Sequence, residues 1–355
     1  MVDRPIIHIR PYKPGDEEAI NSLFNTVFHK TRTIEEWDWK FRDNPAVRDM
    51  EEWIIVAESN GRIISHYANM PTEIKYNNGL LTAGQYVDIM IDPLARKNAQ
   101  LFWKLVREHS KNSKKTTSFT FGFPNEIAYQ VGKLFLGYKD LGGMVQLFKR
   151  LSFRSALKRR FPWCPKWIIN FIHAFSKIFY QFNLMARTTD GNIIVKTVNM
   201  FDERIDKFWN TVKDRYGIMV VRNLSYLNWR YKNKQYSILI GEEGGELIGY
   251  AVTKIEDNND ARVGYIIDIL SCDNKTTSLL KGALQLLLKQ DVDYVLSALL
   301  AHDPLCTYHR KLGFKRHKEF KPIQVTITPL TKEVDTKYLL NQENWHITYG
   351  DTDGF

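Results

Sequence analysis

Cysteine is scarce in this chain: of 355 residues only Cys164, Cys272 and Cys306 are cysteines, with neither close pairing nor metal-ligand spacing. This scarcity argues against a disulfide framework and a cysteine-based metal site, and it favours a reducing compartment. The sequence also lacks runs of about 18 apolar residues, and it lacks an apolar stretch near Met1 that could serve as a signal peptide. We therefore expect a cytoplasmic protein without a membrane span.

Several common catalytic signatures are missing as well. No phosphate-binding P-loop, nucleophile elbow or dinucleotide fingerprint occurs. His302, His309 and His317 lack the spacing of metal ligands, so no metal is expected. The composition is otherwise that of a globular protein, with 44% apolar and 25% charged residues. A chain of this length is expected to form two domains.

Acidic residues are absent from residues 149–187, a segment that carries nine basic residues. Most of the net charge of +10 therefore belongs to this segment. Its aromatic residues recur every four positions, at Trp167, Phe171, Phe175 and Phe179, which predicts an amphipathic helix with a wide apolar face. Such a helix could pack its aromatic residues between two domains, lie on an anionic membrane surface, or contact RNA. Packing is the preferred interpretation and RNA the least favoured one.

The chain contains the same pattern twice, with its landmarks about 175 to 190 positions apart. In the first copy the landmarks are Trp39-Lys40-Phe41, Asn60-Gly61, Val87-Asp88-Ile89 and Leu136-Gly137-Tyr138. In the second copy they are Trp229-Arg230-Tyr231, Gly244-Gly245, Ile267-Asp268-Ile269 and Leu312-Gly313-Phe314. This period is too long for a solenoid, so we predict two related domains.

The periodicity of each copy predicts a strand, a helix, three strands, a helix, a strand, a short helix and a final strand. Antiparallel strands combined with one βαβ crossover indicate an α/β (α+β) fold, in which each domain is a mixed, mostly antiparallel sheet flanked by helices. We expect the final strands, 145–149 and 323–329, each to close its own copy. The predicted organisation is a first domain at 1–149, a basic aromatic connector at 150–190, a second domain at 191–330 and a tail at 331–355 that could dock.

This order of elements resembles the GNAT acetyltransferases. The resemblance rests on Ile9-Arg10-Pro11, the Asn60-Gly61 hairpin, the segment 87–96 and Gly122-Phe123-Pro124-Asn125, and it covers most of residues 6–330. The combination is similar to tandem GNAT proteins that are expected beside surface-polysaccharide genes. The resemblance implies that acetyl-CoA binds in a wedge between two strands and that its acyl group passes to an amine, with an amino sugar as the first acceptor to test.

The resemblance also implies which residues of the first copy bind the cofactor. The strand backbone at Ile89, Met90 and Ile91 would hydrogen-bond the pantetheine as an added strand does. The loop and helix start that follow would face the pyrophosphate, with Asn125 at the mouth of the cleft; these residues are Arg96, Lys97, Asn98, Ala99, Gln100 and Leu101.

The cofactor loop departs from the family pattern. Two glycines of that pattern are replaced here by Ala99 and Leu101, and glycines are the residues that let backbone approach a phosphate closely. The corresponding loop of the second copy, 271–278, has neither arginine nor glycine. We therefore expect CoA to bind the first copy and not the second.

Three residues are candidates for the catalytic groups. Asp88, on the expected cofactor strand, and Glu126, near the mouth of the cleft, could each take a proton from the amine. Tyr129 could protonate the leaving thiolate. The family places this tyrosine four residues before the glycine of the last motif, where this chain has Lys133.

Two alternatives concern single residues. Asp268, the counterpart of Asp88 in the copy that is not expected to bind CoA, favours a structural role for both carboxylates. His66 and Tyr67 follow the first hairpin, where family acceptors usually lie, and they could equally be ordinary surface residues.

Two other functions fit the same sequence. A tandem GNAT-like transferase that uses charged tRNA to extend cell-wall peptides would suit the basic connector and the glycine-poor loop. A non-catalytic scaffold would suit the missing glycines and the displaced tyrosine. Our leading prediction is an acyl-CoA-dependent N-acyltransferase that uses acetyl-CoA and a small-molecule amine. We do not expect a nucleic-acid partner, and segment 150–187 could make peripheral contact with the inner face of the membrane.

Overall fold

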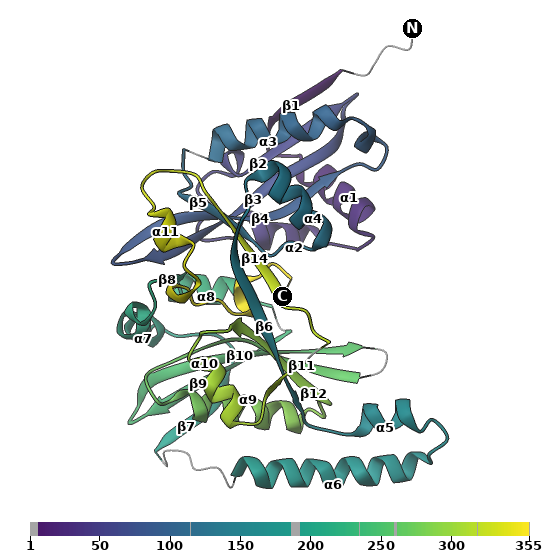
Figure 1. Cartoon of the computed structure of the whole chain (residues 1–355), viewed down its shortest axis with the longest axis vertical. Coiled ribbons are helices and arrows are strands. Elements are labelled where there is room, and N and C mark those ends of the chain that lie inside the picture. The colour runs from purple at the N-terminus through teal and green to yellow at the C-terminus, as the bar shows by residue number, and fades with distance from the viewer. Residues whose placement is uncertain are drawn as a thin grey trace. The chain divides into compact units, whose positions relative to one another are not determined.

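The computed structural model of the chain describes residues 6–113, 115–185, 192–233, 235–258, 261–317 and 319–354 (Figure 1). The chain divides into two compact units, each assembled from separate stretches of sequence. Unit 1 contains residues 1–142, 218–221 and 324–344, and unit 2 contains residues 143–217, 222–323 and 345–355. Both units combine a mostly antiparallel sheet with flanking helices, as the sequence predicts.

Unit 1 is built on a sheet whose strands run in the order β1-β2-β3-β4-β5-β14, with β8 paired to β3. Its strands are β1 (Ile7–Pro11), β2 (Ile54–Ser59), β3 (Arg62–Tyr76), β4 (Gly79–Ile91), β5 (Phe119–Gly122), β8 (Ile218–Val220) and β14 (Ile323–Pro329). Its helices are α1 (Glu17–Phe28), α2 (Ile34–Phe41), η1 (Met50–Glu52), η2 (Ala95–Lys97), α3 (Ala99–Ser113), α4 (Glu126–Val131), the π-helical turn η3 (Gly132–Leu136), α11 (Thr336–Leu339) and η5 (Gln342–Asn344). Neighbouring strands are antiparallel except β4 and β5, which are parallel.

Unit 2 repeats this plan with the strand order β6-β12-β11-β10-β9-β7, and β13 pairs with β6. Its strands are β6 (Lys139–Arg150, from residue 143 onward), β7 (Ile193–Val198), β9 (Tyr236–Glu243), β10 (Glu246–Asn258), β11 (Ala261–Ser271), β12 (Tyr294–Leu300) and β13 (Lys315–Arg316). Its helices are α5 (Arg154–Arg160), α6 (Lys166–Met185), α7 (Arg204–Val212), η4 (Lys213–Arg215), α8 (Leu224–Arg230), α9 (Thr276–Lys289), α10 (Leu305–Lys311) and η6 (Tyr349–Asp351). Here β11 and β12 form the parallel pair.

The two final strands are exchanged between the copies. β6 follows the first copy in sequence, yet it pairs with β12 of unit 2, where Val145 faces Leu299. β14 follows the second copy, yet it pairs with β5 of unit 1, where Thr328 faces Thr120. The expectation that each copy closes its own sheet is therefore wrong. β6 has 12 residues and β14 has seven, and the apolar positions within each specify a strand without specifying which sheet edge it joins.

The hairpins that the sequence predicts are present in both units. Asn60 and Gly61 both have positive φ angles, of 49° and 75°, and they connect β2 to β3. Gly244 and Gly245 connect β9 to β10 with φ angles of 59° and 85°. Two consecutive residues in this region of backbone space match the right-handed twist of the flanking strands.

The described parts of the connector and of the tail both contain helices. The predicted amphipathic helix is α6, which packs against α9 within unit 2 (Figure 1). The preferred interpretation, in which the aromatic residues of this helix are packed away, is wrong: Trp167, Phe171 and Phe175 are exposed. Residues 345–352 of the tail are buried in unit 2, with Trp345 in its core. In the described ranges, no helix combines the length and apolar character needed to cross a bilayer.

Candidate functional site

The parallel strands β4 and β5 of unit 1 stay paired for only three residues each. Ala83–Gln85 of β4 face Phe119–Phe121 of β5, after which β5 ends at Gly122 while β4 continues to Ile91. Beyond Gln85, the side of β4 that faces away from β3 therefore lacks β5 as a neighbour. An open edge of this kind can hydrogen-bond an extended ligand as a sheet accepts another strand.

A β-bulge at Asp88 bends β4 at the start of this open edge. Asp88 has a φ angle of 50°, which is uncommon for a residue other than glycine. The register against β3 shifts here, because Met90 faces His66 and Val87 faces Ala68. Two residues of β4 therefore lie opposite one residue of β3, an arrangement that turns a strand and re-aims its backbone groups.

The backbone of the three predicted cofactor-strand residues points in two directions. The carbonyl oxygen of Met90 accepts a hydrogen bond from Ser65 Oγ at 2.8 Å, and the Asp92 N–H donates to Ile64 O on β3 at 2.8 Å. Met90 therefore turns its polar backbone toward β3 and cannot offer it to a ligand in the open edge. Because successive residues of a strand alternate in direction, Ile89 and Ile91 face the open side.

The loop after β4 holds the basic residues expected to meet a phosphate. Arg96 Nε donates to the carbonyl oxygen of Ile91 at 3.2 Å, so this side chain folds back over the end of β4. Lys97, Asn98 and Gln100 are exposed beside it.

The first turn of α3 begins at Ala99, and its unpaired N–H groups are a favourable place for an anion. Leu101 does not belong to that surface. Its side chain is 1% exposed and packs with Ile55 in the core of unit 1, and its N–H donates to Asn98 O at 3.0 Å. Leu101 therefore holds α3 on the sheet, and its predicted contact with the cofactor does not fit this position.

Asp88 lies in a buried cluster with two cations. Its Oδ2 is 2.5 Å from Arg32 Nη1 and its Oδ1 is 2.9 Å from Lys40 Nζ. Burial alone would raise the pKa of the carboxyl group, but Lys40 and Arg32 outweigh it and lower the pKa to about 2. A carboxylate with so low a pKa is a weak proton acceptor at neutral pH. The cluster instead links α2, through Lys40, and the segment before α2, through Arg32, to β4.

The same ion pair recurs in unit 2, where Arg222 Nε is 3.2 Å from Asp268 Oδ2. Arg32 precedes Trp39 by the same number of residues as Arg222 precedes Trp229. The two arginines therefore belong to the repeat. The sequence analysis missed them, although this spacing was available to find them. Recurrence of the pair in both units favours a structural role for Asp88.

His66 and Tyr67 are buried in unit 1 and do not form an acceptor surface. His66 Nδ1 is 2.7 Å from the carbonyl oxygen of Asp88, and burial lowers the pKa of the imidazole to about 4. The ring is therefore neutral at physiological pH. Tyr67 contacts His109 of α3, with ring centroids 4.4 Å apart. Both residues are part of the packing beneath the bulge.

The remaining candidate residues lie at the start of α4 and along it. Asn125 caps this helix, because its Oδ1 accepts from Ala128 N at 2.9 Å. Glu126 is exposed at the first helical position, and we find no ion-pair partner for it among the described residues.

Tyr129 lies in an exposed polar network on the same helix. Its hydroxyl donates to Asp140 Oδ1 at 2.9 Å, and Lys133 Nζ is 2.9 Å from Asp140 Oδ2. The hydrogen bond to Asp140 raises the pKa of the Tyr129 phenol. The phenol is therefore protonated at neutral pH, as a group that donates a proton to a thiolate must be. Lys133, at the position of the family tyrosine, supports the carboxylate that holds Tyr129.

In unit 2 the space that corresponds to the open edge is filled by the chain itself. β11 and β12 stay paired only as far as Ile266 and Ser297, and η6 of the tail contacts both strands. Thr348 Oγ1 donates to Asp268 Oδ1 at 3.1 Å, and a Cβ added to Gly350 would lie 3.2 Å from that of Asp268. The tail thus lies against β11 and β12 in the part of unit 2 that corresponds to the open edge of β4.

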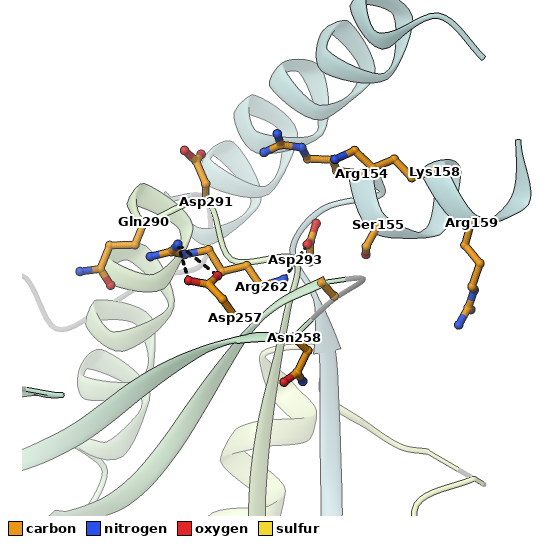
Figure 2. Close-up of a pocket in the computed structure, with 11 residues that line it drawn as sticks. Arg154, Ser155, Lys158, Arg159, Asp257, Asn258, Arg262, Gln290, Asp291 and Asp293 are labelled. Carbon is orange, nitrogen blue, oxygen red and sulfur yellow. Dashed lines mark hydrogen bonds and ion pairs between the residues drawn. The ribbon is translucent and has the colours of Figure 1, made fainter. Parts of the chain in front are cut away.

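A separate polar pocket of about 640 Å³ lies in unit 2 (Figure 2). Basic residues of α5, including Arg154, Lys158 and Arg159, line one side. Asp257 on the opposite side is 3.1 Å from Arg262 Nη1. This pocket is lined by residues of unit 2 and is separate from the open edge of β4 in unit 1. Among the described residues, no group of three or more metal-ligating side chains is arranged to hold a metal ion.

Comparison with known proteins finds a matching domain family in the first part of the chain. Residues 8–132, from β1 to the end of α4, match the acetyltransferase (GNAT) domain family. No curated protein sequence matches the chain.

Solved structures are similar across most of the chain. A GCN5-related N-acetyltransferase from Anabaena variabilis matches with a TM-score of 0.64 and 8% identity, over 92% of this chain and 73% of that one. A probable N-acyltransferase from Enterococcus faecalis matches with a TM-score of 0.64 and 10% identity, over 91% and 72%. The N-myristoyltransferase of Saccharomyces cerevisiae, solved with bound myristoyl-CoA, matches with a TM-score of 0.57 and 12% identity, over 93% and 85%. The chain therefore has the fold of these acyltransferase structures over nearly all its length, and its first part matches the GNAT acetyltransferase domain.

Proposed function

We propose that the protein is an acyl-CoA-dependent N-acyltransferase whose single cofactor site lies at the open edge of β4 in unit 1. The observation that carries this proposal is the separation of β4 from β5 after Gln85, directly before the bulge at Asp88. It leaves strand backbone unpaired at the position where a pantetheine chain would be bound as an added strand. The match of residues 8–132 to the acetyltransferase domain supports the same position.

The residues along the open edge of β4 and in the loop after it match the pantetheine and pyrophosphate parts of acetyl-CoA. Ile89 and Ile91 would hydrogen-bond the pantetheine amides, because their backbone faces the open side. Arg96, Lys97 and the first N–H groups of α3 would meet the pyrophosphate, whose negative charge is favoured at a helix N-terminus. The loop lacks the family glycines, so we expect affinity to depend strongly on these two basic side chains.

Transfer requires one proton to be removed and another to be supplied. The neutral amine attacks the thioester carbon, the carbon–sulfur bond breaks, and CoA leaves as a thiolate. We assign Glu126 to take the proton from the attacking nitrogen, because it is exposed and no described residue forms an ion pair with it. We assign Tyr129 to protonate the thiolate, because its phenol carries a proton at neutral pH and lies on the same helix as Glu126. Asp88 has a pKa of about 2 and two cations beside it. We therefore assign it a structural role, in which its ion pairs stabilise the β-bulge.

The first experiment is isothermal titration of the purified protein with acetyl-CoA. We expect micromolar binding at one site per chain, since the tail fills the corresponding space of unit 2. Arg96→Glu should weaken that binding at least tenfold, whereas Lys315→Glu, the same charge change at an exposed position of unit 2, should leave it unchanged. Two sites per chain would contradict the role of the tail.

The acceptor is tested next by following CoA release with amino sugars as substrates. Acetyl-CoA and myristoyl-CoA should be compared in the same assay, because the solved relatives include an N-myristoyltransferase. Absence of binding to either thioester, together with salt-dependent binding of charged tRNA, would replace this proposal with a tRNA-dependent aminoacyl transfer. A protein that binds neither an acyl-CoA thioester nor charged tRNA would be a non-catalytic protein.

A further inference from the structure

Helix α6 carries two separate apolar stripes. One stripe faces unit 2, where Ile169, Ser176 and Leu184 are buried. On this side Tyr180 packs against the core that includes α9, and Lys177 Nζ is 2.7 Å from Asp291 Oδ1. These contacts fix the helix on the unit without using Trp167 or the exposed phenylalanines.

The second stripe, which we name the aromatic stripe, faces solvent. It consists of Trp167, Phe171, Phe175, Ile178, Phe179 and Phe182, each more than half exposed. The stripe begins after a loop in which Trp163 is 78% exposed. Scattered apolar side chains on a surface are ordinary, but a continuous row of this size marks an interaction surface.

The charge around the aromatic stripe is of one sign. Lys158, Arg159 and Arg160 at the end of α5 are exposed, as is Lys166 at the start of α6. No acidic residue occurs anywhere in 149–187. Basic residues beside exposed tryptophan and phenylalanine are the pattern of helices that lie in the headgroup region of anionic bilayers.

We propose that the aromatic stripe is a peripheral docking surface for an anionic lipid bilayer. The stripe repeats at intervals of three and four residues, so its side chains lie along one side of a straight helix and can enter a flat interface together. The buried stripe keeps α6 attached to unit 2, so the helix lies in the plane of the membrane surface. The exposed basic residues of α5 and Lys166 attract the anionic headgroups.

Other occupants fit the surface less well. A second copy of the chain, joined stripe to stripe, would bring two segments together that each have basic residues and no acidic ones. A single-stranded RNA would need basic side chains interleaved with the aromatic ones. Here the exposed basic residues gather at one end, on α5 and at Lys166.

The test is sedimentation of the full-length protein with vesicles of phosphatidylglycerol and phosphatidylcholine, compared with vesicles of phosphatidylcholine alone. We expect binding to the anionic vesicles and at least tenfold weaker binding to the neutral ones, since each basic residue near an anionic surface contributes about fivefold. Replacing Trp167, Phe171 and Phe175 together by serine should weaken binding to anionic vesicles by roughly 100-fold or more.

A matched control replaces three exposed apolar residues elsewhere, Leu80, Ile194 and Met200, by serine. This variant should bind vesicles as the unmodified protein does. Binding that survives the change in the stripe, or is absent from anionic vesicles, overturns the proposal. A concentration-dependent dimer that the stripe variant abolishes would assign the surface to a second copy, and tight RNA binding without vesicle binding would assign it to RNA. These outcomes do not depend on whether the protein binds acyl-CoA.

Discussion

Replacing Asp88 by asparagine removes the carboxylate that pairs with both Arg32 and Lys40 in the core of unit 1. Both cations then stay buried without their carboxylate. The lowering of the Asp88 pKa from 3.8 to about 2 corresponds to about 2 kcal/mol of stability at neutral pH. Stranding a buried partner usually costs about 3–5 kcal/mol. We therefore expect a loss of about 2–4 kcal/mol in the free energy of unfolding.

Thermal unfolding followed by circular dichroism and calorimetry would measure this loss. For a unit of this size, about 2–4 kcal/mol corresponds to a melting temperature lower by roughly 5–15 °C. Asp140→Asn is the matched control, because Asp140 is also paired to a lysine but is exposed, and it should change stability by less than about 1 kcal/mol. Adding Lys40→Met to Asp88→Asn should recover part of the loss, since it removes one of the two buried positive charges beside the substituted position.

The competing assignment, in which Asp88 is the catalytic base, predicts a different outcome. If Asp88→Asn melted within 2 °C of the unmodified protein but lost most of its turnover with unchanged affinity for acetyl-CoA, the structural argument would be refuted. Asp268→Asn provides a second comparison. It breaks the equivalent pair with Arg222 in unit 2, and it should destabilise the protein without altering cofactor binding by unit 1.

Three further predictions concern packing and protonation. Burial lowers the pKa of His66 to about 4 and of His109 to about 3; below pH 6.5 the unfolded chain therefore binds protons that the folded chain does not. The free energy of unfolding should be highest above pH 6.5 and should fall by about 1.4 kcal/mol per histidine for each pH unit down to about pH 4. Midpoints of urea unfolding that stay constant from pH 7 to pH 5 would contradict this. Gly132→Ala would make a Cβ overlap the Tyr138 ring, so we expect a loss of about 1–3 kcal/mol, measured by urea unfolding. Gly350→Ala would make a Cβ overlap the Tyr231 hydroxyl, so limited proteolysis should cut the tail faster while acetyl-CoA binding stays the same.

Local features of the fold could be predicted from the sequence, because each depends on neighbouring residues. The hairpin at Asn60-Gly61 follows from two residues that tolerate positive φ, and α6 follows from the four-residue recurrence of its aromatic side chains. The mixed sheet follows from the order of these elements along the chain.

Long-range choices could not be predicted in the same way. Periodicity marks β6 and β14 as strands, but pairing is decided by which sheet edge is vacant, and this information is not local. The candidate site shows the same limit. Asp88 was identified from its strand, whereas its partner Arg32 lies 56 positions earlier in a segment without regular structure. The roles of Glu126, Tyr129 and Arg96 in catalysis and binding stay predictions.

The exchange of β6 and β14 has a consequence for synthesis of the protein on the ribosome. When residue 142 has been made, the main body of unit 1 exists, but β5 has no neighbour on one side until β14 emerges nearly 190 residues later. At typical rates of about 5–20 residues per second, β5 waits roughly 10–40 s with an unpaired edge. A nascent chain stalled or truncated in this interval would present that edge to other chains. Expression of either half alone should therefore give aggregation-prone material.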